Sequence, residues 1–268
     1  MTKAPEIKNW KYYQSDPEKK PDRLIFMLHG CGGNADDILK LAPQIQKQSG
    51  CKNFVAVAPD AFLPSAEGDK AYQWFDIETY YSKSLFSSPY ASLCETEKDK
   101  FAAMIRGENG MNKASETLNA FLDFCQKKFG LDDSQTVLLG YSQGAMQALD
   151  MGISRSKAVK SIICVSGCLI PPDETALKNR KVKGVRPEIL MLHGTKDNVI
   201  SIRAAERTAK TLDEAGFKTR LVRQKGLGHG RGREAVVFWA AVAYHTAKQT
   251  IQKTKAFVNF RFKTGNDR

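Results

Sequence analysis

Six short, mostly apolar runs recur along the chain, separated by longer segments, and this alternation limits the fold more than any other feature. The runs are RLIFML (23–28), NFVAVA (53–58), TVLLG (136–140), SIICVS (161–166), EILML (188–192) and KTRLVRQ (218–224). Most of them are apolar throughout, which is typical of parallel strands that are covered on both faces. The sequence therefore predicts a mostly parallel central sheet.

The segments between these runs carry the period of a helix. Apolar residues within 112–129 fall on one helical stripe: Ala114, Leu118, Phe121, Leu122, Cys125 and Phe129. Gly130 follows as a predicted helix stop. Helices are also predicted over 143–153, 202–215 and 233–248. Strands alternating with helices predict an α/β fold with helices on both faces of the sheet.

No internal repeat or low-complexity linker divides the 268 residues, so we predict a single domain over 1–268. The segment 78–111 interrupts the alternation; it is rich in serine and aromatic residues, with one helix predicted near 95–106. An insertion over one end of the sheet would account for it, either as a cap or substrate loop or as a plain surface excursion. Residues 249–268 are predicted to form a basic C-terminal tail.

The net charge of +12 comes from 41 basic and 29 acidic residues. The basic residues are scattered and no nucleic-acid motif is present, so nucleic acid is not expected as a partner. Weak contact of the tail with an anionic membrane surface or an acidic partner is the alternative to a solvated end. The polar N-terminus has no apolar signal region and no apolar run is long enough to span a membrane, so a cytoplasmic location is expected.

The six cysteines suggest neither a disulfide framework nor a metal site. They occupy positions 31, 51, 94, 125, 164 and 168, with no CxxC pair and no Cys/His spacing of a zinc site. We expect reduced thiols in a reducing compartment.

The stretch LGYSQGA (139–145) places Ser142 between two glycines, where a buried strand is predicted to end. A sharp strand-to-helix turn strains the residue at its tip, and small residues on either side relieve the crowding. A serine held in this way presents its hydroxyl outward. The pattern therefore predicts Ser142 as a nucleophile, provided that a base and an orienting acid lie within reach.

Chain order selects the two partners, because in turn-mounted sites of this kind the acid follows the serine and the histidine follows the acid. His229, in the glycine-rich GLGHGRG after the last predicted strand, is the candidate base. Asp197, on the loop after 188–192, is the candidate acid. His29 and His193 each follow a strand in an LHG triplet and are expected to be structural hydrogen-bonding residues.

An oxyanion site requires fixed backbone N–H donors. Gln143 supplies the N–H that directly follows the nucleophile. The second donor is expected from the glycine-rich MLHGCGGN (27–34), where the N–H of Cys31 is the candidate. All of these groups are predicted at the carboxyl edge of the sheet, where ligands bind in open α/β folds.

Six motifs in this order resemble the phospholipase/carboxylesterase family of α/β-hydrolases, which includes acyl-protein thioesterases. They are LHGCGGNADD (28–37), APDAFLP (58–64), YQWFDI (72–77), GYSQGA (140–145), HGTKDNVI (193–200) and GLGHG (226–230). The resemblance implies a serine carboxylesterase that needs no metal or organic cofactor and acts on small-molecule, lipid or protein-bound acyl esters or thioesters. It carries over Ser142, Asp197 and His229 as the triad, with Cys31 and Gln143 as oxyanion donors.

The sequence departs from the family pattern at three places, of which the smallest is Ile200, where a proline is frequent. Cys31 stands where many relatives have an aliphatic residue, and 78–111 is longer than in compact thioesterases, where this region helps to build the acyl groove. Trp74 and Phe75 either border that groove or pack in the core. The HGCGG opening is similar to that of feruloyl esterases and polyester depolymerases, which are the alternative class of enzyme. A hydrolase-fold binding protein without turnover is the non-enzymatic alternative.

Overall fold

The computed structural model describes residues 7–49, 53–77, 105–107, 110–170 and 186–229. Within these ranges a seven-stranded sheet has the order β1-β3-β2-β6-β7-β8-β9. Its strands are β1 (Trp10–Gln14), β2 (Arg23–Leu28), β3 (Phe54–Pro59), β6 (Thr136–Tyr141), β7 (Ser161–Val165), β8 (Glu188–Gly194) and β9 (Lys218–Gln224). A separate antiparallel pair joins β4 (Leu63–Pro64) to β5 (Tyr72–Gln73).

Every neighbouring pair in the large sheet is parallel except β1 with β3. The mostly parallel sheet predicted from the apolar runs is thus confirmed, and all six of those runs form strands. The antiparallel edge strand β1 was missed, because WKYYQ is only partly buried and lies in a polar N-terminal segment. β8 also continues two residues beyond its predicted end at Leu192, so His193 lies inside the strand.

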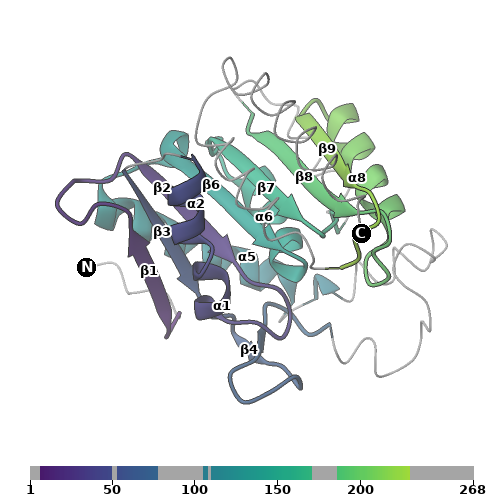
Figure 1. Ribbon diagram of the computed structural model, residues 1–268, viewed down its shortest axis with the longest axis horizontal. Coiled ribbons are helices and arrows are strands. Elements are labelled where there is room, and N and C mark those ends of the chain that lie inside the picture. Colours follow the sequence, from purple (N-terminus) through teal and green to yellow (C-terminus); the bar gives the residue numbers. More distant parts are fainter. Residues whose placement is uncertain (1–6, 50–52, 78–104, 108–109, 171–185, 230–268) are drawn as a thin grey trace, which may run out of the picture.

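Helices cover both faces of the sheet, as predicted (Figure 1). The helices α5 (Met111–Phe129), α6 (Gln143–Ser154) and α8 (Ile202–Glu214) pack against one face in a first apolar core. The short helices α1 (Ala35–Leu39) and α2 (Ala42–Ser49), which the sequence analysis did not predict, pack against the other face in a second core.

Helix α5 shows how the sequence specifies one of these layers. Its stripe of Leu118, Phe121, Leu122 and Cys125 is fully buried, because these side chains lie on one face of the helix. Gly130 ends the helix at φ 65°, in the left-handed region that glycine enters without strain.

The strand order reverses between β2 and β6, which is the feature that positions the site. β3 lies on one side of this central pair and β7, β8 and β9 lie on the other. The loops that leave β2 and β6 therefore part in opposite directions and leave a crevice at the carboxyl edge. Leu28 pairs with Gly140 across these two strands, so the loop after residue 28 starts beside the turn at residue 142.

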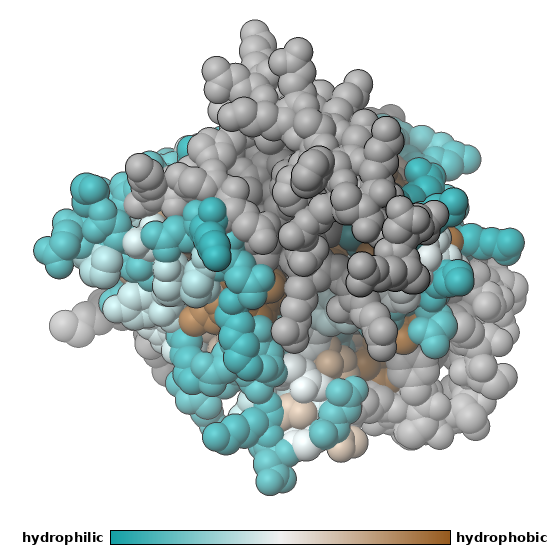
Figure 2. Space-filling view, in the orientation of Figure 1, coloured by the Kyte–Doolittle hydropathy of each residue, from teal (hydrophilic) through white to brown (hydrophobic). Residues whose placement is uncertain are grey.

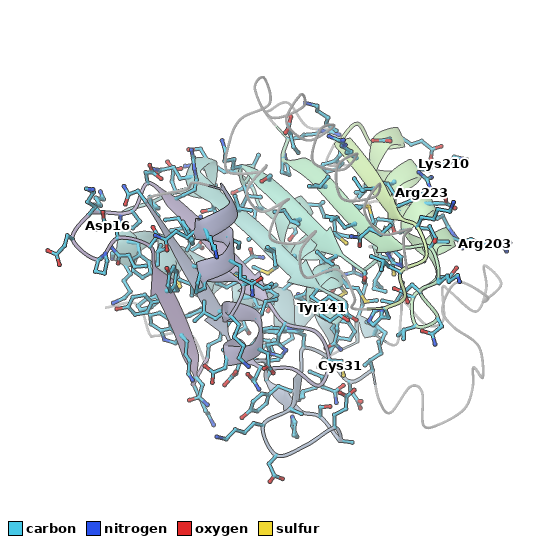
Figure 3. All side chains as sticks on the ribbon, in the orientation of Figure 1. Asp16, Cys31, Tyr141, Arg203, Lys210 and Arg223 are labelled. Carbon is cyan, nitrogen blue, oxygen red and sulfur yellow. The ribbon has the colours of Figure 1, made fainter. Side chains whose placement is uncertain are left out.

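The outer surface of the described part is mainly polar. Hydrophilic residues dominate it on the face seen in Figure 2. Basic side chains of α8 and β9, among them Arg203, Lys210 and Arg223, lie near one another at one edge of the molecule (Figure 3). Arg223 is partly balanced there by Glu206, at 2.8 Å. Among the described helices, none is long and apolar enough to cross a membrane.

Three of the predicted regions lie largely or wholly outside the described residues. These are most of the insertion at 78–111 and the whole of the tail at 249–268, together with the helix predicted over 233–248.

Candidate active site

Ser142 occupies a one-residue turn between β6 and α6. Its backbone adopts φ 52° and ψ −118°, a region that residues other than glycine rarely occupy. The turn is held by a hydrogen bond from the Ser142 N–H to the Val165 carbonyl at 2.8 Å. Such a bend aims the side chain away from the sheet, as the GYSQG pattern predicts.

The two glycines that flank the serine allow the strand and the helix to approach closely. A Cβ on Gly140 would lie 2.2 Å from the Gly144 carbonyl oxygen. A Cβ on Gly144 would lie 2.3 Å from the carbonyl oxygens of Leu28 and His29. Backbone atoms cannot yield as flexible side chains do, so only glycine fits at these two positions.

Two loops that follow β8 and β9 carry the other two predicted triad residues, and backbone hydrogen bonds join them. The Lys196 N–H donates to the Leu227 carbonyl at 2.8 Å, and the Thr195 hydroxyl accepts from the Gly226 N–H at 2.9 Å. A Cβ on Gly194 would lie 2.3 Å from the Leu227 carbonyl oxygen, so this contact also requires glycine. The loop with His229 is thereby seated on the turn with Asp197.

The structure brings all three predicted side chains together. His229 Nε2 lies 3.0 Å from Ser142 Oγ, and His229 Nδ1 lies 2.8 Å from Asp197 Oδ2. The imidazole is partly open to solvent, with 17% of the side chain exposed, whereas the Asp197 side chain is fully buried. A buried acid, an accessible imidazole and a hydroxyl thus form one continuous hydrogen-bonded chain.

Asp197 is held as a carboxylate by donors on both oxygens. Oδ1 accepts the N–H groups of Val199 and Ile200, at 2.9 and 2.8 Å. Burial by itself raises the pKa of Asp197, but hydrogen bonds from His193, His229 and the Ile200 backbone, with the charge of His229, bring that pKa well below its ordinary value.

Tyr141 forms one wall beside the imidazole. Its ring centroid lies 5.5 Å from that of His229, at an interplanar angle of 40°. Burial, the negative charge of Asp197 and that of Glu67 raise the pKa of Tyr141 to about 12. The phenol is therefore neutral at physiological pH.

The predicted oxyanion loop lies against the serine turn. A Cβ on Gly30 would lie 3.3 Å from Ser142 Cβ, and Cys31 is the next residue along the loop. Figure 3 shows Cys31 and Tyr141 close together at this edge of the sheet. Gln143 opens α6, and the first N–H groups of a helix have no acceptor within it.

The side chain of Gln143 has a second function that the sequence analysis missed. Its Oε1 accepts the Trp74 backbone N–H at 2.8 Å, and its Nε2 donates to the Phe75 carbonyl at 2.7 Å. This pair of bonds, which we call the Gln143 latch, joins the start of α6 to the WFDI segment. The signal was present in the sequence, since a glutamine in the first turn of a helix with many apolar residues needs hydrogen-bond partners once it is buried.

Trp74 and Phe75 are both almost fully buried. The Trp74 indole Nε1–H donates to the His29 carbonyl at 2.8 Å, and its ring lies 4.8 Å from the His29 ring, centroid to centroid. These contacts fit the core-packing alternative for both residues. A direct contact with substrate stays a prediction.

The two LHG histidines make the structural hydrogen bonds that were predicted. His29 Nδ1 donates to the Gly30 carbonyl at 2.7 Å, and its Nε2 accepts the Ala61 N–H at 3.1 Å. Burial lowers the pKa of His29, although the Gly30 carbonyl and the charge of Asp60 oppose this. His193 Nε2 lies 2.6 Å from the Ile200 carbonyl oxygen.

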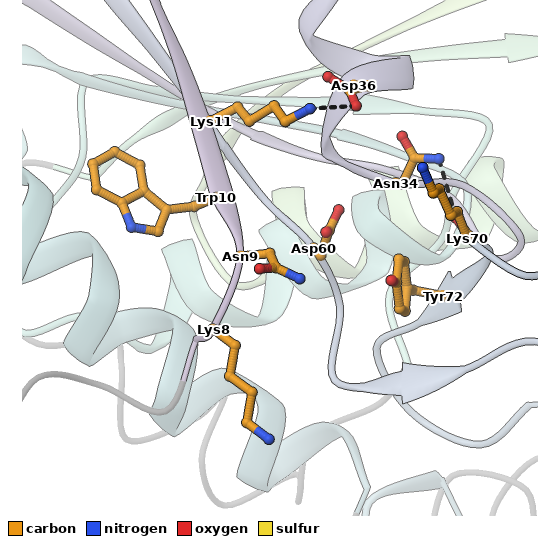
Figure 4. A pocket seen from close by; sticks show the side chains of 9 residues that line it. All are labelled: Lys8, Asn9, Trp10, Lys11, Asn34, Asp36, Asp60, Lys70 and Tyr72. Carbon is orange, nitrogen blue, oxygen red and sulfur yellow. Dashed lines mark hydrogen bonds and ion pairs between the residues drawn. The ribbon is translucent and has the colours of Figure 1, made fainter.

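Two further features border the site. Glu67, which is exposed, lies over Gly32, where a Cβ would come within 1.8 Å of its carboxylate. A pocket of about 370 Å³ lies behind the oxyanion loop and is lined by Asn34, Asp60 and Tyr72, among others (Figure 4). Its lining includes none of the three triad residues. No group of side chains suited to a metal ion occurs among the residues described.

The fold and the motifs both have counterparts among known proteins. A family model described as phospholipase/carboxylesterase matches residues 14–246. The Escherichia coli esterase YpfH is 22% identical over 241 residues, which cover 87% of this chain and 86% of the esterase. Acyl-protein thioesterase 1 of Debaryomyces hansenii is 23% identical over 224 residues, which cover 81% of this chain and 88% of the thioesterase.

Solved structures agree with the assignment of the fold. The crystal structure of esterase PE8 superposes with a TM-score of 0.64 and 25% identity, covering 82% of this chain and 92% of that one. SOBER1 of Arabidopsis thaliana superposes with a TM-score of 0.64 and 20% identity, covering 83% of this chain and 97% of that one. The predicted α/β-hydrolase fold is thus confirmed.

The Gln143 latch generates a first prediction. Gln143→Leu keeps the volume of the side chain but leaves the Trp74 N–H and the Phe75 carbonyl buried without a partner. Each such group costs about 1–3 kcal/mol, so for the two groups we expect urea denaturation to show a loss of roughly 2–6 kcal/mol in the free energy of unfolding. Gln44→Leu, on the exposed face of α2, is the control and should stay within about 0.5 kcal/mol of wild type. Equal stability of the two variants would show that the latch contributes nothing.

Asp197 generates a second prediction, on the acid side of the stability curve. The pKa of Asp197 is depressed in the folded state. Its contribution to the free energy of unfolding is therefore fully present above its pKa in the unfolded chain, about 4, and is lost as the pH falls toward its lower pKa in the folded protein. Asp197→Asn should therefore be less stable than wild type at pH 6, and the two unfolding free energies should converge below about pH 4. Parallel curves in urea titrations at pH 6, 5, 4 and 3 would contradict this.

Proposed function

Because this chain belongs to the phospholipase/carboxylesterase family, we propose that it hydrolyses carboxylic ester or thioester bonds through a serine nucleophile and a covalent acyl-enzyme. The observation that carries the proposal is the hydrogen-bonded chain from Ser142 through His229 to Asp197, at 3.0 and 2.8 Å, on a strained turn at the crevice of the sheet. Relatives named esterase and acyl-protein thioesterase support the same class of reaction.

The first half of the reaction acylates the enzyme. His229 Nε2 removes the proton of the Ser142 hydroxyl as Oγ attacks the acyl carbonyl carbon. Asp197 keeps a proton on His229 Nδ1, which leaves the lone pair of Nε2 facing the serine, and it stabilises the imidazolium that forms. The imidazolium then protonates the departing alcohol or thiol, and the acyl group stays on Oγ.

The second half restores the free enzyme. A water molecule takes the place of the leaving group, gives its proton to His229 and attacks the acyl carbon. The imidazolium returns the proton to Ser142 Oγ, and the carboxylic acid leaves. In both halves the N–H groups of Gln143 and Cys31 receive the oxyanion, a contribution worth a few kcal/mol for each fixed donor.

The substrate class is proposed no more finely than an acyl ester or thioester of a small molecule, a lipid or a protein. Hydrolysis rates can be compared for p-nitrophenyl esters of two to sixteen carbons and for a palmitoyl thioester. The highest rates on short chains would indicate a short-chain carboxylesterase, and the highest rates on long chains a lipid or protein deacylase. Feruloyl esters and polyesters complete the panel, because the HGCGG opening is similar to that of feruloyl esterases and polyester depolymerases.

Ser142→Ala tests the mechanism. We expect the variant to fold with wild-type stability, to lose at least about a thousandfold in kcat/KM on p-nitrophenyl butyrate, and to lose labelling by a fluorophosphonate. The residual rate would come from oxyanion binding alone. Ser154→Ala, at the opposite end of α6, is the matched control and should keep the wild-type kcat/KM and the fluorophosphonate labelling.

Activity of Ser142→Ala within a few-fold of wild type would reject the serine mechanism. A wild-type protein that is neither labelled nor active on any ester of the panel would instead favour the binding-protein alternative.

A further inference from the structure

His193 lies next to the predicted acid as well as next to a carbonyl group. It stands in β8, four residues before Asp197, and only 1% of its side chain is exposed. Its Nε2 is 2.6 Å from the Ile200 carbonyl oxygen and 3.3 Å from Asp197 Oδ2. One ring nitrogen thus faces two oxygen atoms of the turn that carries the acid.

These contacts fix where the proton of His193 lies. The Ile200 carbonyl can only accept a hydrogen bond, so Nε2 must carry the hydrogen. Nδ1 is buried and has no hydrogen-bond partner among the described residues, so it is the bare nitrogen of this tautomer. The Nε2–H therefore bonds to the Ile200 carbonyl, and Asp197 Oδ2 lies 3.3 Å from the same nitrogen, close enough to feel the charge of this N–H.

The longer contact falls on the oxygen that matters for catalysis. Oδ1 of Asp197 is occupied by the backbone N–H groups of Val199 and Ile200. Oδ2 receives the Nδ1–H of His229 at 2.8 Å and also lies 3.3 Å from His193 Nε2. His193 and His229 thus share one carboxylate oxygen.

We propose that His193 is a positioning residue, which fixes the Asp197 turn through Ile200 and, by sharing Oδ2, sets how strongly the carboxylate holds the imidazolium form of His229. The proposal rests on the proposed function, because it assigns Asp197 and His229 the roles described there. It goes beyond that function by placing a second, neutral donor beside the catalytic carboxylate.

The other titratable groups that face this pair are few among the described residues. Tyr141 from β6 packs on the His229 ring, and its phenol stays neutral because its pKa is raised. Cys168, after β7, is fully buried and senses Asp197 and Arg207 of α8, and burial raises the pKa of its thiol to about 12. Neither group changes charge over the range in which a histidine titrates. Both ring nitrogens of His29 have other partners, since Nδ1 lies 2.7 Å from the Gly30 carbonyl oxygen and Nε2 accepts the Ala61 N–H.

Two amide variants separate positioning from a purely structural role. In His193→Gln the side-chain amide nitrogen can occupy the place of Nε2 and keep the donor. In His193→Asn the shorter side chain can place its amide only near Nδ1, which has no partner within the described part of the chain. His29→Gln is the matched control, since it changes the other LHG histidine without touching Asp197.

The readouts are steady-state kinetics on p-nitrophenyl butyrate between pH 5 and 9, and the low-field proton resonance of His229 Nδ1–H. That resonance is assigned by its loss in His229→Gln and is titrated in the resting protein. With the donor gone, the carboxylate charge falls more fully on His229 and stabilises the imidazolium. In His193→Asn we therefore expect two midpoints to rise by roughly half a pH unit: that of the pH–rate profile and that of the titration of the His229 resonance. We also expect kcat to fall about tenfold with KM within twofold of wild type.

His193→Gln should restore the wild-type midpoint and most of kcat, and His29→Gln should leave the midpoint unchanged whatever its effect on rate. A wild-type midpoint in folded His193→Asn would overturn the inference and leave His193 with a structural role alone. If His193→Asn does not fold, a shifted midpoint in His193→Gln overturns the inference and an unshifted one supports it. If the wild-type protein hydrolyses no ester while the resonance still shifts as expected, the proposed function fails and the coupling between His193 and His229 stands.

Discussion

The close approach of β6, α6 and the end of β2 is the constraint on which the rest of the site depends. Three backbone segments meet at Gly140 and Gly144 with no space for a Cβ, since either atom would lie within 2.3 Å of a carbonyl oxygen. This contact forces the positive φ of Ser142 and places Gly30 against it. The strain at the serine is therefore compensated by packing around it, and the loop with Cys31 lies beside the turn for the same reason.

The site also shows one chemical device used twice. The triplets LHG at 28–30 and 192–194 each end in a histidine and a glycine at the carboxyl edge, and each histidine binds a carbonyl of its own loop. At His29 the bond shapes the predicted oxyanion loop. The Trp74 indole binds the His29 carbonyl of this loop, and the Gln143 latch in turn holds Trp74 and Phe75. At His193 the corresponding bond shapes the turn of the acid. Two buried imidazoles thus order the two loops between which the serine lies.

Much of this architecture could be predicted because it is written in local patterns. Short, mostly apolar runs identified all six of the strands they were assigned to, and the period of α5 with Gly130 identified its length. Chain order singled out Ser142, Asp197 and His229, whose side chains the structure brings together. The edge strand β1 could not be predicted, because WKYYQ is only partly buried and its composition does not indicate a strand. It forms a strand because it pairs with β3. The Gln143 latch and the contact of His193 with Asp197 Oδ2 could not be predicted either. Both depend on contacts between separate segments, which no local sequence pattern encodes.

Gln143 combines two tasks in one residue, and this has a consequence for protein engineering. Its amide group secures the WFDI segment, while its main chain stands where the oxyanion is proposed to bind. Substitutions at position 143 keep the main-chain N–H but release the WFDI segment, so a library there would change the stability and the placement of this N–H together. Glu67 offers the opposite situation, since it is exposed and lies over Gly32 at the rim. Directed evolution of substrate preference would start more profitably from that carboxylate.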